Sequence, residues 1–410
     1  MLKQIGRMEL TAVVNAYISM SPFYQDKYGL VENDDFEALP FLSKHELLED
    51  QKKYPPFGTN LACSQEDIIR IHRTSGTTNS PLLIAMTETD LQQVTNIGTT
   101  LFKLVGMCTQ DTVFNCLNYN MWMGGYTDHQ SMEGTGAAIV PYGTGYTDSL
   151  IELICKMPDS SIHCTPSYLS VIKDKLVKRG LKPRDLKLRN GFFGAEAGLG
   201  NPEFRKKIEN EWGIEAFNAN YGISEVISIL GAECSEKDGL HFGASEALYL
   251  ELLNSDMELI PITSGAKGEL VVTHLKKQAQ PLIRYRTGDI FEIISLDSCA
   301  CQFKGFKFSI SGRVDQMLNI KGVNFYPESL RSIVSSYSEL TGNYKVIVSK
   351  EEPINSISAL IEVKQKSSIH EELLTRLIKE IKVSHNVSFE IILTEKIDFV
   401  GNKSKLLERV

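Results

Sequence analysis

The feature that most constrains the fold is an alternation of short apolar runs with amphipathic helical patterns between residues 110 and 212. The strand-like runs are TVFNCL (112–117), GAAIVPYG (136–143), SIHCTP (161–166) and the stretch 186–195, and helical patterns occur at 148–156, 167–180 and 202–212. Strands that alternate with helices of this length are typical of parallel βαβ units. The sequence therefore predicts an α/β core.

The pattern changes after residue 221, where segments such as EALYLELLN and GELVVTHL alternate apolar and polar positions. This alternation predicts antiparallel, half-buried strands, which we expect to form a sheet or barrel appended to the core. From residue 326 a helix, two strands, an amphipathic helix and a last strand predict a compact α+β set. We therefore expect a large N-terminal α/β domain (1–314) and a small α+β C-terminal domain (315–410).

The charge balance excludes a dedicated nucleic-acid binder, because 43 Lys and Arg face 51 Asp and Glu among 410 residues, a net charge of −8. No apolar run approaches the roughly 20 residues that a membrane helix needs, and the first residues lack the apolar core of a signal peptide. We expect a cytoplasmic protein without membrane segments. Eight cysteines in such a chain do not indicate a disulfide framework.

Hydroxyl side chains and a glycine gather before a strand-like run in RIHRTSGTTNSPLLIAMT (70–87). The cluster comprises Thr74, Ser75, Gly76, Thr77 and Thr78. Such residues on one turn can direct several N–H and O–H donors at a phosphate chain. A polar surface turn is the alternative from these residues alone.

Four segments in order resemble the motifs of the adenylate-forming, or acyl-activating, superfamily: RTSGTTNSP (73–81), YGISE (221–225), RYRTGD (284–289) and GRVDQMLNIKGVNFYP (312–327). The residue patterns PLIRYRTGD and MLNIKGVNFYP are similar to those of phenylacetate-CoA ligases and their aryl-CoA ligase relatives. The N-terminal segments AYISMSPFYQDKYG and YPPFG follow the same family's order, so the resemblance covers essentially the whole chain.

The resemblance implies that MgATP activates a carboxylic acid, expected to be aromatic, to an acyl-adenylate, and that a thiol then takes the acyl group. Coenzyme A is the expected thiol, and a carrier protein or an amine is the alternative acceptor. A nucleotide-binding homologue with weakened catalysis is a second alternative, because Asn79 and Ser80 depart from the usual phosphate loop. A homodimer is one alternative for the assembly.

The family's nucleotide motifs assign roles to individual residues. Phosphate contacts fall to Thr74, Ser75, Gly76, Thr77 and Thr78, and the catalytic residues are expected to include Thr78 and Glu225. Glu225 is expected to bind Mg²⁺, and Asp289 to accept hydrogen bonds from the ribose hydroxyls. The remaining nucleotide residues are Ala195, Glu196, Tyr221, Gly222 and Arg313.

The hinge motif implies that the small domain is mobile and rotates about Asp315 between the two half-reactions. A linker salt bridge is the alternative role for Asp315. The family's catalytic lysine lies near the C-terminus, and in GNKSKLLERV the best match is Lys403, with Lys405 as the runner-up. Its amine would stabilise charge on the carboxylate and the α-phosphate.

For the acid, the family implies the segment 119–129, with Tyr119, Trp122, Gly124, Gly125 and His129 around a flat ring. Asp128 either contacts a polar substituent of that ring or caps a helix.

The cysteine and histidine residues at Cys234, His241, Cys299 and Cys301 include three thiols and one imidazole, the ligand types of a structural zinc site. Reduced surface thiols are the alternative. Some relatives carry a Cys-x-Cys-Gly and an upstream Cys and His at matching places, although Gln302 replaces that glycine here. We include Zn²⁺ as a structural cofactor on this basis.

Overall fold

The computed structural model describes residues 4–31, 35–74, 81–196, 198–316, 318–320, 323–349, 354, 357–365, 371–385, 387–397 and 406–410. The chain divides into two compact units. The first comprises Met1–Tyr146, Ser160–His163 and Phe217–Ser309. The second comprises Thr147–Asp159, Cys164–Ala216 and Ile310–Val410. The domain boundary predicted at Asp315 stays a prediction.

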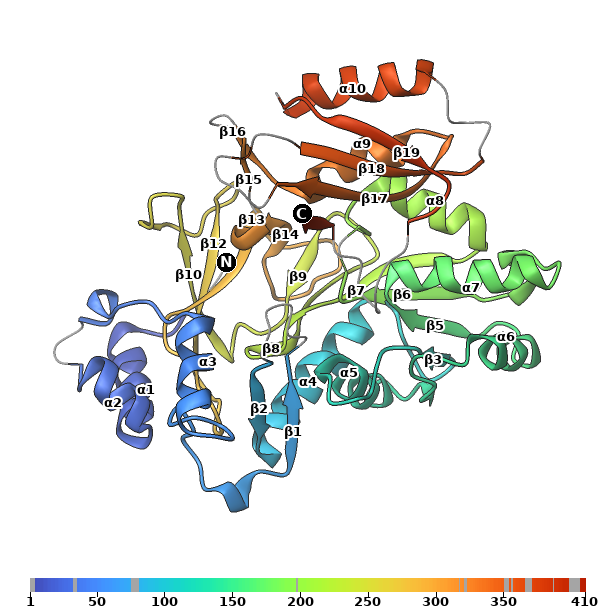
Figure 1. Cartoon of the computed structure of the whole chain (residues 1–410). Helices are drawn as coiled ribbons and strands as arrows, with labels where there is room; N and C mark the ends of the chain where they lie inside the picture. Colours follow the sequence, from blue (N-terminus) through green and yellow to red (C-terminus); the bar gives the residue numbers. More distant parts are fainter. Residues whose placement is uncertain are drawn as a thin grey trace. The chain divides into compact units, whose positions relative to one another are not determined.

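Two of the longer helices of the first unit begin with capping boxes. The helices of this unit are α1 (Arg7–Met20), α2 (Pro22–Tyr28), η1 (Asp35–Ala38), α3 (Lys44–Lys53), η2 (Gln65–Asp67), α4 (Glu88–Leu104) and α5 (Met123–Glu133). Ser43 and Glu46 form a capping box before α3, and Thr87 and Asp90 form one before α4. Helices α4 and α5 pack against each other and against a strand of this unit (Figure 1).

The strands of the first unit combine parallel and antiparallel pairing. They are β1 (Arg70–Arg73), β2 (Leu83–Met86), β3 (Thr112–Asn115), β4 (Ala138–Val140), β5 (Ser161–Cys164), β7 (Glu215–Ile223), β8 (Ile227–Glu233), β9 (Leu240–Phe242), β10 (Leu248–Leu253), β11 (Leu259–Ile260), β12 (Lys267–His274), β13 (Tyr285–Ser295) and β14 (Lys307–Arg313). Strand β3 pairs in parallel with β4 and β5. The pairs β7–β8, β8–β9, β10–β12 and β12–β13 are antiparallel. The predicted change from parallel to antiparallel strands is confirmed.

The second unit contains a separate four-stranded sheet in the order β19-β18-β17-β20. Its elements are α6 (Thr147–Lys156), α7 (Pro166–Lys178), η3 (Pro183–Leu186), β6 (Asn190–Gly194), α8 (Pro202–Trp212), η4 (Val314–Gln316), β15 (Leu318–Ile320), β16 (Val323–Phe325), η5 (Pro327–Ser329), α9 (Leu330–Ser336), β17 (Leu340–Val348), β18 (Ile357–Val363), α10 (Glu371–His385), β19 (Glu390–Thr394) and β20 (Leu407–Arg409). The predicted α+β C-terminal region is confirmed, and among its described elements the short strands β15, β16 and β20 were not predicted.

Helix α10 covers the four-stranded sheet through one apolar stripe (Figure 1). Leu373, Leu377 and Ile381 lie four residues apart and are fully buried in the core of this region. Burial of each such side chain contributes about 1.5–3 kcal/mol. On the neighbouring side of the unit, Lys207 of α8 donates to the carbonyls of Tyr337 (3.1 Å) and Leu340 (2.8 Å).

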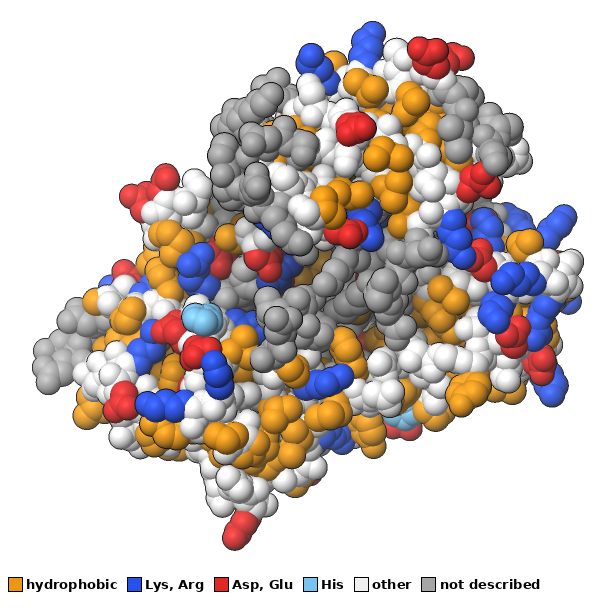
Figure 2. Space-filling model, viewed as in Figure 1, with side chains coloured by type: hydrophobic (Ala, Val, Ile, Leu, Met, Phe, Trp, Pro, Cys, Tyr) orange, Lys and Arg blue, Asp and Glu red, His pale blue; other side chains and the backbone are white. Residues whose placement is uncertain are grey.

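The surface over α6 and α7 carries acidic and basic side chains side by side (Figure 2). Lys175 and Arg179 both contact Asp148, at 2.8 and 2.9 Å. This face therefore carries paired charge instead of a patch of one sign. Among the described residues, no helix combines the length and the apolar character needed to span a membrane.

Candidate functional site

The hairpin of β1 and β2 is closed at its base by two hydrogen bonds. The buried Thr74 donates its N–H to the Leu82 carbonyl (2.9 Å), and its hydroxyl oxygen accepts from the Leu82 N–H (3.0 Å). The predicted phosphate-loop residues between these two positions, Ser75, Gly76, Thr77 and Thr78, lie outside the described residues. Their contacts with phosphate stay a prediction.

The segment predicted to bind the acid is tied to the same hairpin. The Arg73 N–H, at the end of β1, donates to the Met121 carbonyl (2.9 Å). Helix α5 then begins directly after the half-buried Trp122. A Cβ at Gly125 would lie 2.2 Å from the Asn118 carbonyl oxygen, so only glycine fits there. The close approach holds the first turn of α5 against the chain that leads into it.

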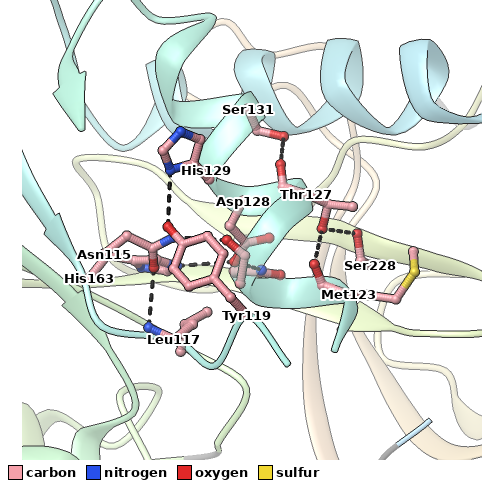
Figure 3. A network of polar contacts seen from close by, with 12 residues as sticks. Asn115, Leu117, Tyr119, Met123, Thr127, Asp128, His129, Ser131, His163 and Ser228 are labelled. Carbon is pink, nitrogen blue, oxygen red and sulfur yellow. Dashed lines mark hydrogen bonds and ion pairs between the residues drawn. The ribbon is translucent and has the colours of Figure 1, made fainter. Parts of the chain in front are cut away.

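Tyr119 and His129, both predicted for the acid, meet in a polar network (Figure 3). The Asn115 side-chain amide donates to the Tyr119 hydroxyl (2.8 Å), which lies 3.0 Å from His129 Nδ1. His129 Nε2 in turn lies 3.1 Å from the Glu133 carboxylate. Burial raises the pKa of Tyr119 above its ordinary value, so the hydroxyl stays protonated at neutral pH.

Asp128, one residue before His129, is fully buried. Its Oδ2 lies 3.0 Å from His163 Nε2 on β5 and accepts from the Asn220 side-chain amide of β7 at 2.6 Å. It therefore contacts neighbouring strands and does not cap a helix. Gly124 lies one turn earlier, and a Cβ there would lie 4.0 Å from Asp128 Oδ2.

Glu225, the predicted magnesium ligand, is buried in the turn between β7 and β8. Its Oε1 contacts the Lys44 ammonium (2.9 Å) and accepts a hydrogen bond from the Tyr285 hydroxyl (2.7 Å). Burial alone would raise the pKa of this carboxyl, but the Lys44 charge and the Tyr285 hydroxyl together lower it. Glu225 is therefore an anionic oxygen donor at neutral pH, which is the chemistry that Mg²⁺ requires.

Two other predicted nucleotide residues lie in direct contact. The Tyr221 hydroxyl donates to Asp289 Oδ2 at 2.5 Å, and the Asp289 N–H donates to the Thr287 hydroxyl oxygen at 3.1 Å. The Tyr221 ring packs edge-on against Phe291 and Phe308. Asp289 is thus a fixed and buried carboxyl. Gly222 lies between Tyr221 and the loop that carries Glu225.

The second unit holds the other predicted residues that are described. Ala195 has a positive φ of 62°, an uncommon conformation for a residue with a Cβ. Glu196 accepts from the Ser167 N–H (3.1 Å) and hydroxyl (2.8 Å) at the start of α7. Arg313 and Asp315 form a salt bridge (2.9 Å), the alternative that the sequence left open. The hinge role of Asp315 stays a prediction, and Lys403 and Lys405 lie outside the described residues.

The four predicted zinc ligands come together from three places in the first unit. Cys234 follows β8, His241 lies on β9, and Cys299 and Cys301 lie between β13 and β14. Their ligand atoms all lie within 4.8 Å of one another. Cys234 Sγ is 3.8 Å from Cys299 Sγ, and Cys301 Sγ is 3.4 Å from His241 Nε2.

These two distances fit a zinc ion with tetrahedral coordination. With Zn–S of about 2.3 Å and Zn–N of about 2.0 Å, tetrahedral angles place two sulfurs about 3.8 Å apart and a sulfur and a nitrogen about 3.5 Å apart. The other ring nitrogen of His241, Nδ1, lies 3.4 Å from the Gly305 carbonyl. A donor contact there orients the ring so that Nε2 faces the three sulfurs.

Sequence reasoning missed several polar side chains that contact predicted residues. Among them are Lys44, Asn115, His163, Asn220 and Tyr285. For two of them the sequence offers a clue to a role in the site, because Asn220 directly precedes YGISE and Tyr285 lies within RYRTGD. It offers no such clue for Lys44, since nothing relates this lysine to Glu225, which lies 181 positions later.

Comparisons with known proteins identify the family of the chain. A family model described as the AMP-binding enzyme C-terminal domain matches residues 322–409. The phenylacetate-coenzyme A ligase of Escherichia coli (strain K12) is 32% identical over 352 residues, which cover 84% of this chain and 79% of that protein. The Pseudomonas putida enzyme of the same name is 30% identical over 368 residues, covering 88% of this chain and 81% of that enzyme.

Among solved structures, a 2-hydroxyisobutyryl-CoA ligase in the postadenylation state has a TM-score of 0.86 at 22% identity, covering 98% of this chain and 88% of that chain. This likeness confirms the fold, and the sequence relatives establish the family. The chain belongs to the phenylacetate-coenzyme A ligase family of adenylate-forming enzymes.

Proposed function

We propose that the protein is an AMP-forming ligase that joins a carboxylic acid to coenzyme A. The observation that carries the proposal is the convergence in one unit of a buried, ionised Glu225 and a fixed Tyr221–Asp289 pair. Both features lie on motifs that resemble the nucleotide-binding motifs of the family to which the chain belongs.

The reaction has two half-reactions at one site. First, a carboxylate oxygen of the acid attacks the α-phosphorus of ATP, and pyrophosphate leaves, which gives an acyl-adenylate. Then the sulfur of coenzyme A attacks the acyl carbon, the C–O bond to AMP breaks, and the thiol proton is released. The first step brings several negative charges together, so the site must supply cations and hydrogen-bond donors.

The described residues suit these demands. Glu225 would hold Mg²⁺, which neutralises charge on the phosphate oxygens when bound. Asp289 would accept the ribose hydroxyls, and the Tyr221 ring would lie against the adenine. The acid is proposed to bind beside α5, where Tyr119 and His129 are already oriented by their contacts.

The test is exchange of labelled pyrophosphate into ATP across a panel of aryl and short-chain acids, with thioester formation measured separately in the presence of coenzyme A. We expect Mg²⁺-dependent and acid-dependent exchange, followed by thioester formation only when coenzyme A is present. Exchange without thioester formation would point to a carrier protein or an amine as the acceptor. Nucleotide binding without exchange for any acid would indicate a homologue that has lost catalysis.

We also propose that Cys234, His241, Cys299 and Cys301 bind one structural Zn²⁺. The tetrahedral distances support this, together with the orientation of the His241 ring. A closed set of four protein ligands leaves no open position, which is typical of structural zinc.

Elemental analysis of chelator-washed, folded protein should find about one zinc per chain. Cys301→Ser should lose most of the metal and unfold at a lower temperature, because one ligand bond is removed. Cys155→Ser is the matched control, since Cys155 is an exposed free thiol far from the cluster in sequence. Folded wild-type protein without zinc, or equal metal content in both variants, would rule out the site.

A further inference from the structure

The buried polar network beside α5 contains two oxygen atoms without a hydrogen-bond partner. Asp128 Oδ2 contacts His163 and Asn220, but Asp128 Oδ1 has no partner among the described residues. The side-chain oxygen of Asn220, Oδ1, is also buried and has no partner there. Asp128 is 0% exposed and Asn220 is 7% exposed, so bulk water does not solvate these atoms.

Two orphaned acceptors in one contact pair are energetically unfavourable. A buried acceptor left without a donor costs about 1–3 kcal/mol, and nearly all buried polar atoms in folded proteins have a partner. The Asn220 amide is held by its 2.6 Å hydrogen bond to Asp128, so its oxygen stays directed away from that bond. A group that supplies N–H or O–H donors would therefore be stabilised here.

The neighbouring side chains make this side of α5 polar as well (Figure 3). The hydroxyls of Thr127 and Ser228 lie 2.8 Å apart, and both residues are buried. On the same helix, Gly124 presents no side chain toward Asp128: a Cβ added there would meet only Leu117 Cδ1 at 3.5 Å and Asp128 Oδ2 at 4.0 Å. The glycine leaves methyl-sized space beside Oδ2 of the carboxyl, the oxygen that already contacts His163 and Asn220.

We infer that the acid activated by this protein carries a hydroxyl or amino group, which donates hydrogen bonds to Asp128 Oδ1 and Asn220 Oδ1. The inference rests on the proposed function, because it places the acid beside α5, and it narrows the substrate class from carboxylic acids in general to acids with a hydrogen-bond donor. Asp128 and Asn220 are then residues that determine specificity. Either substituent supplies the required donor, and an amino group can donate to both oxygens at once.

The size of the expected substrate preference follows from measured effects of unpaired buried groups. A site whose buried groups hydrogen-bond a substrate hydroxyl or amine can reject the analogue without it by about 10⁴-fold, because the protein groups are then left unpaired. We expect at least ~10²-fold here, since an internal water can replace part of the lost contact.

The experiment measures kcat/KM for pyrophosphate exchange with matched aryl acids in which one ring position carries hydroxyl, amino, methyl or hydrogen. Wild-type protein should prefer the best hydroxyl or amino acid over its methyl analogue by at least ~10²-fold. Asp128→Ala should lose most of that preference, because it slows the reaction of the donor acid much more than that of the methyl acid. The hydroxyl and amino arms identify which donor the site takes.

Two further variants serve as a control and as a substitute for Asp128→Ala. Asp111→Ala removes the same atoms at another buried aspartate of this unit and should keep the wild-type preference. If Asp128→Ala does not fold, Asn220→Ala removes the second acceptor and should also reduce the preference. Thermal unfolding and circular dichroism establish that each variant is folded before its kinetics are compared.

The outcomes separate this inference from the function on which it rests. Exchange with no acid at all would contradict the ligase proposal. Exchange that is as fast with the methyl acid as with its hydroxyl and amino analogues, at every ring position, would overturn only the inference and would indicate that an internal water satisfies both oxygens. An unchanged preference in both Asp128→Ala and Asn220→Ala would overturn it equally.

Discussion

Substitution of Gly222 by alanine tests whether the spacing between β7 and β8 positions the nucleotide residues. A Cβ at this position would lie 1.9 Å from the Ser228 carbonyl oxygen and 2.2 Å from the Ser228 carbonyl carbon. Real Cβ contacts do not fall below 3.0 Å, so one strand must move by at least about 1.1 Å, the difference between 3.0 and 1.9 Å. Both clashing atoms are backbone, so a rotamer change cannot relieve the contact.

That displacement occurs between Tyr221, which contacts Asp289, and the loop that carries Glu225. Overpacking of this kind typically costs about 1–3 kcal/mol, and a shift of about 1 Å in reacting groups can reduce a rate about 10²-fold. We therefore expect Gly222→Ala to lower Tm by several degrees and to slow pyrophosphate exchange by about 10²-fold. The slowing should occur with every acid, because the displacement acts on residues of the nucleotide site.

Pyrophosphate exchange and thermal unfolding are measured on Gly222→Ala beside Gly6→Ala. Gly6 precedes α1 with an ordinary φ of −67° and has no heavy atom within 4 Å of its added Cβ, so the control makes the same chemical change without a clash. If the two variants exchange pyrophosphate at equal rates, the spacing of β7 and β8 does not position the nucleotide residues.

Other predictions follow from single residues. Glu225→Gln should reduce exchange at least ~10²-fold, because Mg²⁺ would lose an anionic ligand, and near-normal exchange would remove Glu225 from the site. Lys403→Ala should slow adenylation but spare thioester formation from supplied acyl-adenylate, whereas Asp315→Pro should slow thioester formation and spare adenylation. Equal slowing of the same half-reaction by both substitutions would refute the proposal that the C-terminal domain alternates between two positions. Burial, followed by the nearby Lys277 charge, lowers the pKa of His274 to about 3, and both its ring nitrogens contact backbone groups. The unfolded chain therefore binds the extra proton first, so the free energy of unfolding should fall as the pH drops below about 6.5 toward 3. Urea titrations at pH 7 and 5 should show a smaller loss for His274→Gln than for wild type, and an equal loss would assign the acid sensitivity elsewhere.

Most of the fold follows from hydrophobic periodicity. Helix α8 (Pro202–Trp212) has the predicted bounds, and the antiparallel strands β10, β12 and β13 fall within the alternating segments. Short elements carry too few residues for a period to appear, which is why the three-residue strand β20 was missed. Its position beside β17 depends on tertiary pairing, which no local pattern encodes.

The candidate site could be predicted where chemistry and motif coincide in one segment. Tyr221 and Asp289 were each identified from their own motif, but their direct contact was not. Arg284 lies in the same motif as Asp289 but forms a buried ion pair with Glu251. Its structural role could not be predicted from the motif. Sequence motifs identify residues, whereas the partners that orient those residues come from distant elements.

The contact between Lys44 and Glu225 has a consequence for the order in which ligands bind. A tethered ammonium already occupies Glu225 Oε1 and has a far higher effective concentration there than a free ion in solution. Free Mg²⁺ would have to bind a carboxylate whose charge this ammonium already offsets, and a strongly hydrated ion gains little from such a ligand. Mg²⁺ that arrives on the phosphates of ATP brings its other ligands with it. Lys44 therefore favours recognition of the metal–nucleotide complex as a single substrate and disfavours a metal-loaded resting enzyme.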